Sequence, residues 1–286
     1  MELLEQLTGH AGHATTEWHD YPSGGAHTVV GTVKVSSAEF GPPESGQRHL
    51  LVYLPPSYAW SDRRYPVIYM HDGQNLFDAA TSFSGEWHVD ATMEALSGEG
   101  IEAIIVGIPN AGPQRTAEYS PFPHPWLGGG RAASYIHFLT DTVKPLIDQA
   151  FRTQPDRAHT GTAGSSLGGL VSLYAFFAAP LVFGFAGVFS PALWSTQGKM
   201  AALVQQTPFI GGRLYMDVGD QETPGGSGRR STYLIDEAQR MAALLRAKGY
   251  PPADLQFHVA LGGQHNETSW AARLPGALRF LLAGQR

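Results

Sequence analysis

The chain has 286 residues, of which 43% are hydrophobic and 15% are charged, and its formal net charge is −6. This length suits one large α/β domain, and the hydrophobic fraction is ample for a buried core. No basic run occurs, which argues against a nucleic-acid partner. The chain contains no cysteine, so disulfides, thiolate metal sites and a cysteine nucleophile are excluded.

The N-terminal segment 1–26 is polar and rich in histidine, and we expect a loosely ordered lead-in to a single domain over 27–286. His10 and His13 have a metal-like spacing, but no third ligand is nearby, so we interpret them as surface residues and expect no metal. The first residues show no secretory signal, and no run approaches the ~20 apolar residues that span a membrane. We therefore expect a cytoplasmic protein without a membrane partner.

Strands and helices alternate after this lead-in. Short apolar runs predict strands at 29–35, 48–54, 67–70, 103–108, 157–163, 185–189, 214–218 and 255–260. Periodic apolar positions predict helices at 89–96, 135–150, 168–179, 234–245 and 270–281, the last bent or restarted at Pro275. This alternation predicts an α/β fold, with a mostly parallel central sheet and helices on both of its faces.

The strongest chemical signal is the segment Gly164-Ser165-Ser166-Leu167-Gly168, which matches the pattern G-x-S-x-G. A sharp turn from strand to helix exposes the central serine, and glycines on both sides avoid clashes. The pattern therefore predicts Ser166 as a nucleophile. Ser165 does not fit, because its register would need glycine at Ala163 and Leu167. The alternative reading is a glycine-rich loop with a serine that caps a helix.

A serine nucleophile needs a base, usually histidine, that a carboxylate orients. Two histidines follow Ser166, namely His258 and His265. His258 lies within a predicted strand, which favours a structural role. His265 lies in the loop just after that strand, where the carboxyl edge of a parallel sheet binds ligands. We therefore predict His265 as the base.

The acid should follow the predicted strand at 214–218, where Asp217, Asp220 and Glu222 are candidates. Asp217 lies inside the strand, where alternation fixes the direction of its side chain. Asp220 directly follows Gly219 and comes too early to reach the histidine. Glu222 lies two residues further on and has a longer side chain. We therefore favour Glu222 over the two aspartates.

An oxyanion hole needs two main-chain N–H groups. One should belong to Leu167, directly after the nucleophile. The other should come from the loop after the third strand, residues 71–75, where Gly73 permits a tight turn and Gln74 N–H is the best candidate. The alternative for this loop is a helix-cap turn made by Asp72 or Asn75.

Several segments together resemble the putative-esterase branch of the α/β-hydrolase superfamily, which contains enterochelin esterases, feruloyl and acetyl-xylan esterases and mycolyltransferases. They span roughly residues 30–285, nearly the whole chain. The resemblance rests on 69–77, 107–110, Arg115, Glu118, Tyr119, the Ser166 segment, 189–194, 263–267 and Trp270.

The resemblance implies an α/β-hydrolase fold without a large lid domain and without a cofactor. It implies a serine carboxylesterase that acts on a small-molecule ester through an acyl-enzyme, and it points to an acid three positions after Gly219, at Glu222. It also implies that Arg115, Tyr119 and Trp194 bind substrate around the mouth of the site, although an ion pair and simple packing would explain them too. A mycolyl-type acyltransferase and a non-enzymatic binding protein on the same fold remain the alternatives.

Overall fold

The computed structural model describes residues 16–126, 128–223 and 232–285. Within them, nine strands form one sheet in the order β1-β2-β3-β5-β4-β6-β7-β8-β9. The pairs from β5 to β9 are parallel, and the pairs that join β1, β2, β3 and β5 are antiparallel. The strands are β1 Trp18–Asp20, β2 Thr32–Phe40, β3 Arg48–Leu54, β4 Val67–His71, β5 Ile104–Ile108, β6 Thr160–Ser165, β7 Phe185–Phe189, β8 Arg213–Gly219 and β9 Leu255–Ala260.

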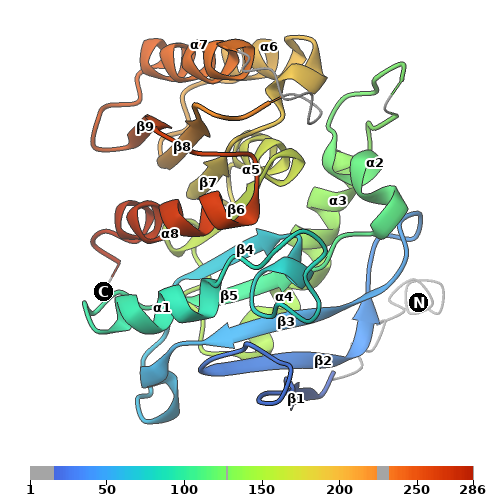
Figure 1. The fold of residues 1–286 in the computed structure, drawn as a ribbon, viewed down its shortest axis with the longest axis vertical. Helices are drawn as coiled ribbons and strands as arrows, with labels where there is room; N and C mark the ends of the chain where they lie inside the picture. The colour runs from blue at the N-terminus through green and yellow to red at the C-terminus, as the bar shows by residue number, and fades with distance from the viewer. Residues whose placement is uncertain (1–15, 127, 224–231, 286) are drawn as a thin grey trace, which may run out of the picture.

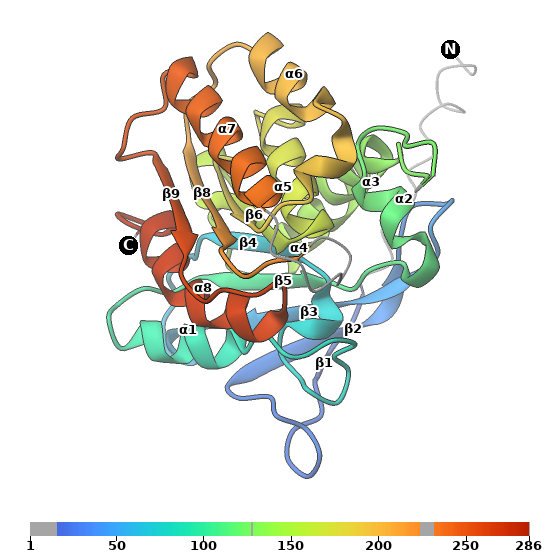
Figure 2. The ribbon, with the colours of Figure 1, turned by 45° about the horizontal axis from the view of Figure 1, so that its top comes forward.

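Helices cover both faces of this sheet (Figures 1 and 2). Helices α1 and α8 pack side by side on one face, and α2 to α7 cover the other. The helices are α1 Val89–Ser97, α2 Arg115–Tyr119, α3 Ala132–Phe138, α4 Lys144–Ala150, α5 Leu167–Ala178, α6 Lys199–Gln206, α7 Thr232–Lys248 and α8 Glu267–Leu281. The predicted α/β architecture with a mostly parallel sheet is confirmed.

The central strand β5 shows why its sequence is a continuous apolar run. Ile105 packs into the cluster that includes α1 and α8, whereas Ile104, Val106 and Ile108 pack into the cluster that includes α3 and α4. All four side chains are fully buried. A strand covered on both faces has no solvent side, so apolar residues fill every position.

The N-terminal part of the sheet differs from the prediction. Trp18–Asp20 forms β1 and pairs with β2, so this part of the expected loose lead-in is ordered. Strand β2 reaches Phe40, because pairing with β3 resumes after a register shift between Val35 and Glu39. The polar residues at this antiparallel edge hide both features from a search for apolar runs. His10 and His13 lie outside the described residues.

Two helices also depart from their predicted course. The segment predicted as one helix over 135–150 is α3 and α4 joined by a π-helical turn, Leu139–Val143, with Pro145 in the first turn of α4. Helix α8 starts at Glu267 and runs through Pro275 without restarting. Its first turn is capped by the Asn266 side chain, which accepts from Ser269 N–H. In the described part of the chain no helix is long and apolar enough to cross a membrane.

Candidate active site

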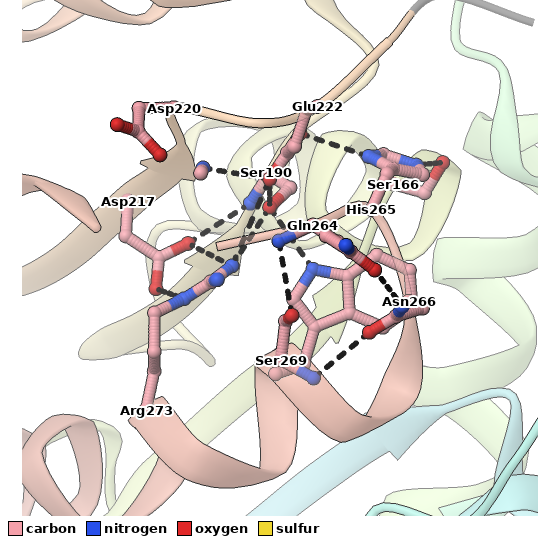
Figure 3. A network of polar contacts seen from close by, with 12 residues as sticks. Ser166, Ser190, Asp217, Asp220, Glu222, Gln264, His265, Asn266, Ser269 and Arg273 are labelled. Carbon is pink, nitrogen blue, oxygen red and sulfur yellow. Dashed lines mark hydrogen bonds and ion pairs between the residues drawn. The ribbon is translucent and has the colours of Figure 1, made fainter. Parts of the chain in front are cut away.

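Three loops meet at the carboxyl edge of the parallel strands. The first follows β6 and carries Ser166, the second follows β8 and carries Glu222, and the third follows β9 and carries His265. Figure 3 shows the three side chains as one line of polar contacts. Parallel strands end at the same edge of a sheet, which brings together residues that lie far apart in sequence.

Ser166 has the strained backbone that its motif predicts. Its φ is 57° and its ψ is −119°, a conformation that non-glycine residues rarely adopt. Its N–H donates to the carbonyl of Phe189 at 3.0 Å, which holds the turn. A Cβ atom at Gly164 would lie 2.9 Å from the carbonyl carbon of Gly168, so the turn has no room for a larger residue there. The surrounding packing therefore fixes the backbone of Ser166.

The histidine connects the serine to the acid. His265 Nε2 lies 2.9 Å from Ser166 Oγ, and His265 Nδ1 lies 2.9 Å from Glu222 Oε2. A carboxylate only accepts hydrogen bonds, so Nδ1 carries the proton and Nε2 is free to accept from the serine hydroxyl. The ring of His265 also packs edge-on against Trp270, with centroids 5.0 Å apart. The geometry fits a serine activated by a neutral imidazole.

The Glu222 carboxylate is buried and held at both oxygens. Oε2 faces His265, while Oε1 accepts from Gly219 N–H at 2.7 Å and from the Ser190 hydroxyl. Burial raises the pKa of Glu222, but the contacts with His265, Ser190 and Gly219 outweigh it and lower the pKa below its ordinary value. Glu222 is therefore an anion at neutral pH, with its orientation fixed.

Ser190 links this carboxylate to α8. Its hydroxyl donates to Glu222 and accepts from Trp270 Nε1 and Arg273 Nη2, each at 2.9 Å (Figure 3). Arg273 in turn forms a bidentate pair with Asp217, at 2.7 and 3.1 Å. Neither Ser190 nor Arg273 could be given a role from the sequence, because their contacts join three segments that only the fold brings together.

The other candidate acids and the second histidine have different partners. Asp217 is fully buried against Arg273 and the Tyr215 hydroxyl. Asp220 points away from the histidine and accepts from Gly262 N–H at 2.7 Å (Figure 3). His258 lies in β9 and contacts the Tyr215 hydroxyl at 3.2 Å. Of the three acids, Glu222 is the one hydrogen-bonded to His265.

The two expected oxyanion donors lie on the loops predicted for them. Leu167 is the first residue of α5, whose leading N–H groups have no partner inside the helix. Gln74 lies in a short turn, Gly73–Asn75, that follows Asp72 in a left-handed conformation with φ 56°. A Cβ atom at Gly73 would lie 2.7 Å from the main chain of Gly107, so glycine is required in this turn.

A cavity of about 360 Å³ opens at Ser166 and His265. Most of the residues that line it have polar side chains, and most of them come from four loops. The lining residues are Asp72, Gln74, Asn75, Phe83, Ser84, Asn110, Arg115, Ser165, Ser166, His265, Asn266, Glu267 and Trp270. Phe83 stands out because its side chain is 92% exposed. The cavity is of a size that suits a small organic ligand.

Arg115 and Asp72 form an ion pair in this cavity. Arg115 Nε and Nη2 donate to the two Asp72 oxygens at 2.6 and 2.7 Å. Burial lowers the pKa of Arg115, but the hydrogen bonds and charge of Asp72 outweigh it and raise the pKa above its ordinary value. Asn110 Nδ2 also donates to Asp72 at 2.7 Å. Within the described residues, Arg115 Nη1 has no hydrogen-bond partner.

Two residues expected to bind substrate do not line this cavity. Tyr119 is fully buried beneath Asp72, whose N–H donates to the Tyr119 hydroxyl at 3.2 Å. Trp194 is 40% exposed in a turn after β7, outside the cavity lining. Glu118 pairs with Arg48 in a buried ion pair at 2.7 Å. The resemblance placed Tyr119 and Trp194 near the site, but the directions of their side chains depend on packing that a single sequence does not encode.

Phe83, Ser84 and Glu267 line the cavity but had no role assigned from the sequence. Phe83 and Ser84 lie on the loop between the Gln74 turn and α1, and no motif marks that loop. Glu267 lies two residues after the predicted base, and this closeness to His265 in the sequence is the one feature that could have marked it as a site residue. In the described ranges, no three histidine or carboxylate side chains are placed to hold a metal ion.

Comparisons with known proteins show which sequences and folds this chain is similar to. The model of the family described as “Putative esterase” matches residues 45–281. Uncharacterized protein YbbA of Bacillus subtilis is 25% identical over 252 residues, 85% of this chain and 96% of that protein. The siderophore triacetylfusarinine C esterase of Aspergillus fumigatus is 30% identical over 147 residues, 47% of this chain and 48% of that protein.

A solved structure shows the same fold. The siderophore hydrolase EstA from Aspergillus nidulans superposes with a TM-score of 0.69 at 18% identity, over 93% of this chain and 98% of that one. This likeness, together with the mostly parallel sheet described above, identifies the α/β-hydrolase fold.

Proposed function

The chain belongs to the “Putative esterase” family and is a carboxylic ester hydrolase, and we propose that it acts through a Ser166–His265–Glu222 triad and an acyl-enzyme intermediate. The observation that carries this proposal is the unbroken line of contacts from Ser166 Oγ to His265 and on to Glu222, at 2.9 Å each. The strained backbone of Ser166 supports the same role.

The proposed reaction has two halves. His265 Nε2 accepts the Ser166 proton while Oγ attacks the ester carbonyl, and the tetrahedral intermediate collapses as His265 returns that proton to the departing alcohol. A water molecule then attacks the acyl-enzyme with the same histidine as base, and the products are a carboxylic acid and regenerated Ser166. Glu222 stabilises the imidazolium that forms in each half.

The N–H groups of Leu167 and Gln74 are the proposed oxyanion donors. Both lie on rigid elements, the start of α5 and the Gly73–Asn75 turn. Donors fixed in advance stabilise the developing oxyanion more than solvent does, because they do not reorganise during the reaction. The role of Gln74 is also consistent with its place in the lining of the cavity at Ser166.

For the substrate we propose a small ester that carries hydrogen-bonding groups near the scissile bond. The polar side chains in the cavity lining favour such a molecule over a plain fatty-acyl ester, as does Arg115 Nη1, which has no hydrogen-bond partner among the described residues. Arg115 is the proposed substrate contact. The similarity to proteins named as siderophore esterases is compatible with this class of ester.

The proposed mechanism predicts that Ser166→Ala folds normally and loses activity by about 10⁴-fold or more. Hydrolysis of p-nitrophenyl acetate tests this, with circular dichroism as the check on folding. A variant that keeps more than a tenth of the wild-type kcat would show that Ser166 is not the nucleophile.

A further inference from the structure

Glu267 joins two distant parts of the site. It is the first residue of α8, two residues after His265, and its side chain is 6% exposed. Its Oε1 accepts from Ser84 Oγ at 2.6 Å and from Asn75 Nδ2 at 3.3 Å. The loop that carries His265 is thereby connected to the segment that carries Gln74, nearly 200 residues earlier in the chain.

Asn75 is the centre of the contacts that hold the Gln74 turn. Its N–H donates to Asp72 O at 2.9 Å, and its carbonyl accepts from Trp87 N–H at 2.8 Å. Its side-chain oxygen accepts from Phe83 N–H at 3.0 Å. The side-chain NH₂ group of Asn75 is the part that reaches Glu267. Every polar group of Asn75 therefore fixes the turn against a neighbour.

The carbonyl and the side chain of Gln74 each form a hydrogen bond. Its carbonyl accepts from Thr81 Oγ1 at 2.8 Å, and its side-chain oxygen accepts from Asn110 N–H at 3.1 Å. These contacts fix the turn locally. Pairing of β4 with β6 holds the turn beside Ser166, and the contact between Asn75 and Glu267 adds a direct link to the loop that carries His265.

The loop that contains Gly85 passes close to Glu267. Gly85 has a φ of 124°, and a Cβ atom there would lie 3.3 Å from Glu267 Cβ. The chain therefore passes directly over the Glu267 side chain and covers it. A buried carboxylate costs free energy unless it is hydrogen-bonded, and here Ser84, Asn75 and the N-terminus of α8 supply the compensation. Packing alone does not require a charged residue at this position.

We propose that Glu267 is a positioning residue that sets the Gln74 N–H relative to Ser166 and His265. The inference rests on the proposed function, because it takes Gln74 as an oxyanion donor. An oxyanion donor acts mainly in the transition state, so misplacing it lowers kcat more than it raises KM. Binding of the substrate before the reaction depends on this N–H group much less.

The test compares Glu267→Ala with Glu267→Gln. Glu267→Ala removes the acceptor, and we expect kcat to fall by about 10- to 100-fold while KM stays within about threefold. Binding of a tetrahedral boronate inhibitor should weaken by a similar factor. Glu267→Gln keeps an acceptor of the same reach and should restore most of kcat. Glu237→Ala, on α7 outside the active-site cavity, is the matched control and should leave kcat unchanged.

A second variant guards against misfolding of Glu267→Ala. Ser84→Ala removes one of the donors to Glu267 and should also lower kcat, but by a smaller factor. Wild-type kcat and inhibitor binding in both Glu267→Ala and Ser84→Ala would overturn the inference, as would equal losses in kcat and substrate affinity. If these results are obtained while Ser166→Ala is inactive in the same assay, only the role of Glu267 is contradicted. Full activity in Ser166→Ala would overturn the proposed function and this inference with it.

Discussion

Replacing Glu222 by glutamine is a sharp perturbation of the site, because it changes one atom and leaves the shape intact. Oε1 of Glu222 accepts from Gly219 N–H at 2.7 Å and from the Ser190 hydroxyl. The amide carbonyl of a glutamine can take over both bonds, which turns its NH₂ group toward His265 Nδ1. That group only donates, so Nδ1 has to become an acceptor and the ring proton moves to Nε2.

A histidine protonated at Nε2 cannot accept the proton of Ser166. The variant therefore keeps its fold and loses its base, the same consequence that follows in serine proteases when the triad aspartate becomes asparagine. We expect Glu222→Gln to lower kcat by about 10²–10⁴-fold, which corresponds to about 3–5 kcal/mol of activation free energy. Thermal unfolding should shift little.

The assay is kcat for p-nitrophenyl acetate, measured beside Asp220→Asn as the matched control. Asp220 accepts from Gly262 N–H and does not contact His265, so its loss should cost less than about tenfold. A Glu222→Gln enzyme within tenfold of wild type, or a larger loss in Asp220→Asn, would refute the assignment of the acid.

Three further predictions concern the base, metals and pH. His265→Ala should lower kcat by about 10⁴-fold, whereas His258→Ala, which loses a contact with Tyr215, should change mainly the melting temperature; equal losses of activity in two folded variants would contradict this. Esterase activity should survive EDTA, and loss with recovery on adding zinc would contradict the triad mechanism. Burial raises the pKa of Asp90 to about 6, above its value of ~3.9 in the unfolded chain. Between these two pH values the folded protein holds the Asp90 proton more tightly than the unfolded chain does, so stability falls as pH rises. Asp90→Asn should remove about 2–3 kcal/mol of that decline, measured by urea unfolding at several pH values, and an unchanged pH slope would contradict it.

The site residues that could be predicted from the sequence are those fixed by the local backbone and by the order of the strands. Gly164 is needed by the turn itself and Gly168 by the close approach of His71 and Asp72, so the pattern is visible in one short segment. His265 and Glu222 follow from the order of elements, because loops after successive parallel strands meet at one edge of the sheet. The reach of a glutamate side chain then separates Glu222 from Asp220, and the structure pairs Glu222 with His265.

Side-chain direction and long-range packing account for what the sequence could not predict. Tyr119 lies on a short helix whose rotation turns its ring under Asp72 and away from the cavity. The exposed Phe83 belongs to a loop without a hydrophobic period. Glu267 gains its partners from a segment nearly 200 residues away. Single sequences carry no signal for such contacts, since any polar residue is compatible with a loop.

The central claim is that Ser166 forms a covalent acyl-enzyme. A fluorophosphonate ester, which forms a stable adduct with activated serines, tests it most directly when the labelled protein is digested and analysed by mass spectrometry. The mechanism predicts one adduct, on the peptide that contains Ser166, and none in Ser166→Ala. An active enzyme that takes up no label, or a label on a different residue that abolishes activity, would contradict it.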